Sequence, residues 1–104
     1  MPELNASSQG RESIYLAALR VWGADAQMDL CAEEGGELIA ALNRFRRGRS
    51  TKAAVVEELA DVSIMLEQMA LIFCQDVEIA KVHKLERLRQ LLLNIASDGE
   101  GYNV

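Results

Sequence analysis

The sequence predicts an all-α protein that folds as one bundle-like domain of four helices. Apolar residues recur at helical spacing along most of the chain, and no Asn-Gly or Asp-Gly turn joins two alternating strands. The single proline, Pro2, stands at the start of the sequence, so no proline breaks the pattern internally. Half of the 104 residues are apolar, which is typical of a globular domain.

Four segments carry the helical pattern, separated by glycines or polar turns. They cover about residues 11–22, 25–47, 51–73 and 77–96. Gly23 and Gly48 suit the ends of the first two helices, and Asp25 and either Ser50 or Thr51 suit N-caps of the second and third. We expect one domain over residues 1–104, with flexible ends at residues 1–10 and 97–104.

The second half of the third predicted helix is apolar on nearly every face. Its apolar residues are Val62, Ile64, Met65, Leu66, Met69, Ala70, Leu71, Ile72 and Phe73. A helix of this kind is usually covered by its own domain on one side and by a partner on the other. A short chain also buries a small share of its surface, so oligomerisation adds core. We therefore expect a homodimer or homotetramer built around residues 64–73.

Charge and composition exclude several classes of protein. The chain has 11 basic and 16 acidic residues, a net charge of −5, which argues against binding to a nucleic-acid polymer. No apolar run is long enough to span a membrane, and residues 1–12 lack the features of a signal peptide. Cys31 and Cys74 lie in apolar helical surroundings, as reduced structural thiols do. We expect a cytoplasmic protein.

Two pairs of carboxylates have the same three-residue spacing on successive helices. Glu34 and Glu37 lie on one face of the second helix, and Glu58 and Asp61 lie on one face of the third. If these helices pack antiparallel, all four carboxylates face one groove and repel one another unless a cation lies between them. Such oxygen ligands suit Mg²⁺ or Mn²⁺. The alternative is an exposed acidic patch without a ligand.

Gly35 and Gly36 interrupt the same stretch of the second helix. A glycine in a helix interior costs about 1 kcal/mol relative to alanine. Because glycine has no side chain, we expect this pair to let a ligand or a neighbouring helix approach closely.

The acidic residues resemble the E-E-x-x-E…E-x-x-D signature of the MazG-like nucleotide pyrophosphohydrolases, members of the all-α NTP pyrophosphatase superfamily. The matching residues are Glu33, Glu34 and Glu37, followed after 20 residues by Glu58 and Asp61. The similarity extends over roughly residues 20–90. The resemblance implies Mg²⁺-dependent cleavage of a nucleoside triphosphate, ribo or deoxy, into a monophosphate and pyrophosphate. It also implies dimers or dimers of dimers.

The resemblance also implies roles for individual residues. Glu34, Glu37, Glu58 and Asp61 match the metal ligands of the family and would bind Mg²⁺, or Mn²⁺ in its place. Glu33 matches the first glutamate of the motif and is the catalytic residue that we expect to orient or deprotonate water.

Substrate binding requires further residues that offset phosphate charge and hold the base. We expect Lys84 and Arg87 to bind phosphate; the alternative is a solvated amphipathic face. The family often has a further arginine about one turn beyond, where this chain has leucines at 91–93. Gln27 is a candidate to hydrogen-bond a base edge, and Trp22 is a candidate to stack on the base. For Trp22, however, we favour the other interpretation, a place in the core.

Four arginines around the end of the second predicted helix form a basic turn. They are Arg44, Arg46, Arg47 and Arg49. They either attract phosphate or form an ordinary exposed turn, and we favour the exposed turn.

Two other functions remain open. One is phosphoribosyl-ATP pyrophosphohydrolase, an enzyme of the same superfamily with the same acidic layout, which a panel of substrates separates from the first function. The other is a non-catalytic helical oligomer that acts as a binding module, for which no metal-dependent release of pyrophosphate is expected.

Overall fold

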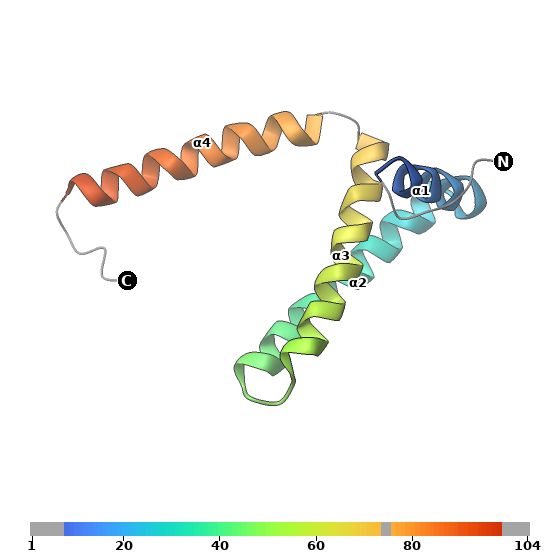
Figure 1. Cartoon of the computed structure of the whole chain (residues 1–104), viewed down its shortest axis with the longest axis horizontal. Helices are drawn as coiled ribbons and strands as arrows, with labels where there is room; N and C mark the ends of the chain where they lie inside the picture. The colour runs from blue at the N-terminus through green and yellow to red at the C-terminus, as the bar shows by residue number, and fades with distance from the viewer. Residues whose placement is uncertain (1–7, 74–75, 99–104) are drawn as a thin grey trace. The chain divides into compact units, whose positions relative to one another are not determined.

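The computed structural model of the protein describes residues 8–73 and 76–98, and these residues contain four α-helices and no strand. The helices are α1 (Ser8–Trp22), α2 (Ala24–Arg46), α3 (Lys52–Phe73) and α4 (Asp76–Ser97) (Figure 1). The predicted all-α class and its four helices are confirmed. Of the expected flexible ends, residues 8–10 belong to α1 and residue 97 to α4, while residues 1–7 and 99–104 lie outside the described residues.

The chain divides into two compact units, Met1–Ile72 and Phe73–Val104. Helices α1 and α2 and nearly all of α3 belong to the first unit, and α4 belongs to the second. Within the described part of the chain, no helix combines the length and the apolar character needed to cross a membrane. Cys31 is a half-buried free thiol, and Cys74 lies outside the described residues.

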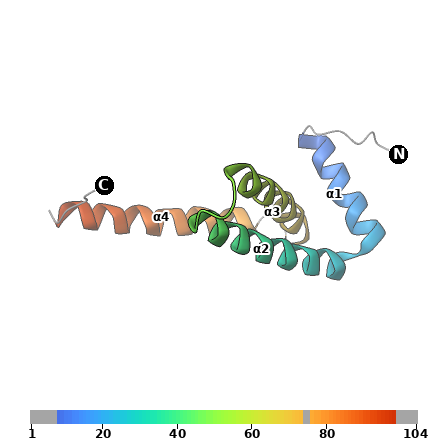
Figure 2. The same ribbon diagram turned by 90° about the horizontal axis from the view of Figure 1, so that it is seen from below.

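A short turn joins α2 and α3, which run side by side in opposite directions (Figures 1 and 2). The Arg49 amide donates to the Arg44 carbonyl at 2.9 Å, and the Gly48 amide donates to the Phe45 carbonyl at 3.0 Å. This pair of bonds is the Schellman motif, and Gly48 supplies the left-handed conformation it needs, with φ of 72°. The turn therefore fixes how α3 leaves the end of α2.

The two predicted N-caps have different outcomes. Thr51 caps α3, because its hydroxyl oxygen accepts a hydrogen bond of 3.1 Å from the Ala54 amide. The expectation for Asp25 is wrong: α2 begins one residue earlier, and its N-cap is Gly23, which makes no side-chain capping bond. Asp25 instead lies in the first turn, where its negative charge faces the positive end of the helix dipole.

The chain turns at Gly23, between α1 and α2. The first half of α1 lies against the second half of α3 (Figure 1). The buried hydroxyl of Tyr15 donates a hydrogen bond to a carboxylate oxygen of Glu67. Arg11 forms an ion pair of 3.5 Å with the same carboxylate. Glu67 thus joins two donors of α1 to α3.

Apolar side chains remain exposed along α3. They include Val56, Leu59, Ile64, Leu66 and Phe73. Met65 is buried on the same helix, and Ala41 is buried on α2. The first unit thus covers only part of the surface of α3.

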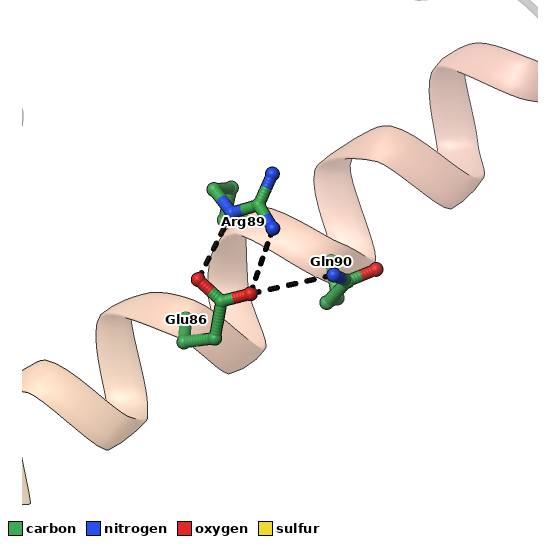
Figure 3. Close-up of polar contacts among 3 residues, drawn as sticks. All are labelled: Glu86, Arg89 and Gln90. Carbon is green, nitrogen blue, oxygen red and sulfur yellow. Dashed lines mark hydrogen bonds and ion pairs between the residues drawn. The ribbon is translucent and has the colours of Figure 1, made fainter.

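Helix α4, taken by itself, is amphipathic, and none of its residues is buried. Its exposed apolar residues include Val77, Leu85, Leu88, Leu92 and Ile95. On its polar side, Glu86 accepts two hydrogen bonds from Arg89, at 2.8 and 2.9 Å, and one of 3.3 Å from Gln90 (Figure 3). Such local pairs support an exposed helix.

Candidate metal centre

Three carboxylates converge between α2 and α3. Glu34, Glu37 and Glu58 each offer an oxygen, and these oxygens lie within 4.8 Å of one another. Glu34 and Glu37 lie one turn apart on α2, and the antiparallel α3 brings Glu58 to them. We call these three residues the acid cluster. They are three of the four predicted metal ligands.

The fourth predicted ligand, Asp61, is exposed and lies one turn after Glu58 on α3. It is not among the three convergent carboxylates. Its charge nevertheless raises the pKa of both Glu34 and Glu58. Glu33, the predicted catalytic residue, is exposed on α2, and its charge also raises the pKa of Glu34.

Two oxygens of the acid cluster are enclosed without a hydrogen-bond donor. The Oε2 atoms of Glu34 and Glu58 are inaccessible to solvent and have no hydrogen-bond partner. Over residues 8–73 and 76–98, no ion pair reaches Glu34, Glu37 or Glu58. An enclosed carboxylate oxygen without water or donor is costly, so it calls for a cation or a proton.

The pKa values of Glu34 and Glu58 reflect this enclosure. Loss of hydration is the main reason that the pKa of Glu34 lies above its usual range, and the negative charges of Glu37, Asp61 and Glu58 add to it. The pKa of Glu58 is also raised, first by loss of hydration and then by the charges of Glu37 and Asp61. Glu34 and Glu58 therefore hold their protons more strongly than ordinary glutamates do, because the pKa of each is raised.

Arg44 has the opposite effect on the cluster. Its positive charge lowers the pKa of Glu58. The sequence pattern of the basic turn does not single out Arg44 from its neighbours. A signal does exist, because Arg44 follows Glu37 by seven residues, which puts both on one face of α2.

The acid cluster fits a hard divalent cation. Carboxylate oxygens are the ligands that Mg²⁺ and Mn²⁺ prefer, and the two enclosed Oε2 atoms lack any other partner. Beside it, a Cβ added at Gly35 or Gly36 would meet no atom within 4 Å. The expected close approach of a neighbouring helix to these glycines is therefore not seen in the described residues, and open space is left there.

The predicted substrate-binding residues lie in different surroundings. Gln27 is buried, and its side-chain oxygen accepts a hydrogen bond of 2.6 Å from Gln68. A contact between Gln27 and a base edge would require this bond to break. Trp22 is 65% exposed at the end of α1, so the favoured interpretation, which placed it in the core, is wrong. Lys84 and Arg87 are exposed on α4, in the second compact unit.

Comparisons of the chain with protein-family models, with curated proteins and with solved structures gave no match. The chemistry of the acid cluster is therefore inferred from the residues of α2 and α3 themselves.

Proposed function

We propose that the protein is a MazG-like nucleoside triphosphate pyrophosphohydrolase. With Mg²⁺, or with Mn²⁺, it converts an NTP or dNTP and water into the monophosphate and pyrophosphate. The observation that carries this proposal is the convergence of Glu34, Glu37 and Glu58, with two enclosed oxygens that have no donor. An ordinary exposed acidic patch would leave those oxygens in contact with water.

The acid cluster would hold the cation, and Asp61 would contribute from its exposed position one turn after Glu58. A bound Mg²⁺ neutralises charge on phosphate oxygens and lowers the pKa of a coordinated water. Because Glu33 is exposed next to Glu34, its carboxylate is free to accept a proton from the attacking water.

Positive and aromatic side chains would bind the rest of the substrate. Arg44 already acts on the charge of Glu58, so a phosphate held at the cluster would also attract it. Lys84 and Arg87 are exposed and positively charged, as phosphate-binding residues must be. The exposed ring of Trp22 offers a face on which a base can stack.

The proposed enzyme is a homodimer or homotetramer. The apolar residues exposed on α3, among them Ile64, Leu66 and Phe73, support this part of the proposal. Covering them with a second copy removes apolar area from water, which is the main favourable term in protein association. Light scattering at micromolar concentration tests it, and a well-folded monomer would contradict it.

The test of the activity is a substrate panel. The protein is incubated with Mg²⁺ and each of the common NTPs and dNTPs, and the products are identified by ³¹P NMR. We expect pyrophosphate and a monophosphate from at least one substrate, and neither from the Glu58→Gln variant. Orthophosphate as the product, or no hydrolysis of any nucleotide, would contradict the proposal.

A further inference from the structure

A polar pair is buried between α2 and α3, away from the acid cluster. Gln27 is 5% exposed and Gln68 is 3% exposed. The Gln68 amide nitrogen donates to the Gln27 side-chain oxygen at 2.6 Å. Buried polar side chains need such partners, and apolar residues at the same positions would pack without them.

The glutamine pair and the carboxylates share one register of α2 against α3. Gln27 lies seven residues before Glu34, and Gln68 lies seven residues after Asp61. Glu37 lies three residues after Glu34, and Glu58 lies three residues before Asp61. In two antiparallel helices, equal steps in opposite directions connect positions that are level across the seam. The register that joins the glutamines thus also sets Glu58 opposite Glu37.

Apolar contacts alone fix this register weakly. The hydrophobic effect is non-directional, and α3 is apolar on nearly every face after Asp61. A displacement by one turn would exchange apolar neighbours while moving Glu58 about 5.4 Å along α2. It would also separate Gln27 from Gln68 and leave both amides buried without partners. Buried polar groups are known to specify register between helices in this way.

Different hydrogen bonds then hold the two ends of the α2–α3 pair. The Schellman turn at Gly48 fixes the end where the chain reverses. The glutamine pair lies near the other end, close to the start of α2. The acid cluster lies between them.

We propose that the Gln27–Gln68 hydrogen bond fixes the register of α2 against α3 and so places Glu58 level with Glu37, where its carboxylate also reaches Glu34. The two glutamines are positioning residues. Their effect on metal binding rests on the proposed function, whereas their effect on register does not.

The experiment replaces both glutamines with leucine, of similar size, in the full chain with Cys31 and Cys74 changed to serine. Spin labels are attached at Asp29→Cys on α2 and Ser63→Cys on α3, both exposed positions, in samples diluted with unlabelled protein. Pulsed EPR then gives the distance distribution between the labels, and titration gives the Kd for Mn²⁺. A Gln27→Met/Gln68→Met variant accompanies the leucine variant, because methionine adapts to irregular packing. Met65→Leu, another buried position on α3, is the matched control.

We expect a narrow distribution in the wild type and the control, and a distribution widened toward about one helical turn in the two double variants. We expect their melting temperature to be retained or raised, since an apolar pair leaves no amide unpaired, while Mn²⁺ binds about tenfold more weakly. A distribution as narrow as that of the wild type in both double variants overturns the register proposal. A widened distribution with unchanged Mn²⁺ affinity overturns the positioning role. If the wild type does not bind Mn²⁺, the proposed function fails, and the distances alone decide the register.

Discussion

Two sets of carboxylates in this protein differ in what surrounds them. On α4, Glu86 receives three hydrogen bonds from Arg89 and Gln90, which hold the pKa of its carboxyl below the usual range (Figure 3). Between α2 and α3, the pKa values of Glu34 and Glu58 are raised, and each has an enclosed oxygen with no donor. The chain thus satisfies a carboxylate with local donors in one place and leaves two unsatisfied in another.

The difference indicates what the unsatisfied carboxylates are suited to bind. Glu86 and Glu67 have donors in the folded chain, so their charge is already stabilised. Glu34 and Glu58 each have an oxygen that can coordinate a divalent cation without losing an existing hydrogen bond. Repulsion and lost hydration make the metal-free cluster costly, and a bound cation offsets both.

The largest expected effect is on turnover. Glu58→Gln keeps the shape of the side chain but removes a charged ligand where charge develops during phosphoryl transfer, so kcat should fall by about 100-fold or more. Asp61→Asn should act in the same direction. The measurement is the steady-state rate of pyrophosphate release with Mg²⁺. Glu57→Gln, the exposed neighbour, serves as the control and should retain activity. Full activity in Glu58→Gln would show that Glu58 is not needed for turnover, and it would remove the functional difference between the two sets of carboxylates.

The second effect is on stability in the presence of metal. Mg²⁺ or Mn²⁺ at about 100 times its Kd should raise the free energy of unfolding by about 2.7 kcal/mol, because the cation binds the folded form. Glu37→Gln should raise the melting temperature of the metal-free protein and reduce the metal effect. Glu86→Gln should leave the metal effect unchanged. If divalent cations leave the melting temperatures of both the wild type and Glu37→Gln unchanged, the acid cluster is a surface patch.

The third effect concerns a carboxylate that has its donors. Tyr15→Phe removes the hydrogen bond to Glu67 and should lower the free energy of unfolding by about 1.5 kcal/mol. Loss of hydration, followed by the bond to Glu67, raises the pKa of Tyr15 to about 12 from 10.0. Because the folded state keeps the phenol protonated to higher pH, the contribution should be complete below pH 10 and lost by about pH 12. Chemical denaturation of the wild type and of Tyr15→Phe across this pH range measures the difference in their free energies of unfolding. This difference should shrink toward about pH 12, and it should not grow as the pH rises.

The helices were predictable because their signals are local. Apolar spacing and the turns at Gly23 and Gly48 placed the helix ends to within a few residues. Asp25 was assigned as a cap because its side chain suits one, but Gly23 both ends α1 and begins α2. The start of α1 at Ser8 was predicted three residues too late, at residue 11, because the apolar spacing begins only at Ile14.

The candidate site was predictable only in part, because it depends on two helices at once. The three-residue spacing on α2 predicts that Glu34 and Glu37 share a face, and the carboxylates of these two residues do converge. Which carboxylates converge depends on the register between α2 and α3 and on the direction of each side chain, neither of which the spacing contains. Asp61 is level with Glu34 in this register, but it is exposed and falls outside the acid cluster. The pairing of Gln27 with Gln68, and the effect of Arg44 on Glu58, arise from the same register.

A smaller effect is expected from the glycines next to the acid cluster. Gly36→Ala should raise the free energy of unfolding by about 1 kcal/mol, because alanine favours the helix and its Cβ would meet open space. Chemical denaturation without metal measures this gain. Activity assays then show whether the open space serves the substrate: a raised KM in Gly36→Ala is expected if a ligand approaches there. Lower stability in Gly36→Ala would mean that this part of α2 is not an ordinary helix interior.

The smallest effect, and the one that compares the two sets of carboxylates most directly, is on the pH dependence of the metal-free protein. The folded state raises the pKa values of Glu34 and Glu58, so it binds more protons than the unfolded state just above the usual range for glutamate. Their contribution to stability is therefore greatest below the unfolded pKa and is lost as pH rises through the folded pKa. Glu86 has a lowered pKa, so its contribution is present above the unfolded pKa and lost as pH falls.

Melting temperatures between about pH 3 and pH 8, with a chelator present, separate the two behaviours, because the pKa of Glu86 is lowered and its titration needs the acid end of this range. Glu58→Gln should be more stable than the wild type near pH 7, and this advantage should shrink toward pH 4, because glutamine resembles the protonated glutamate. Glu86→Gln should be less stable than the wild type near pH 7, and its deficit should shrink as the pH falls. The shifts should be small, since exposed charges are screened by water and salt. If the two variants depend on pH with the same sign, the carboxylates between α2 and α3 are hydrated like any others, and the main support for a metal centre is lost.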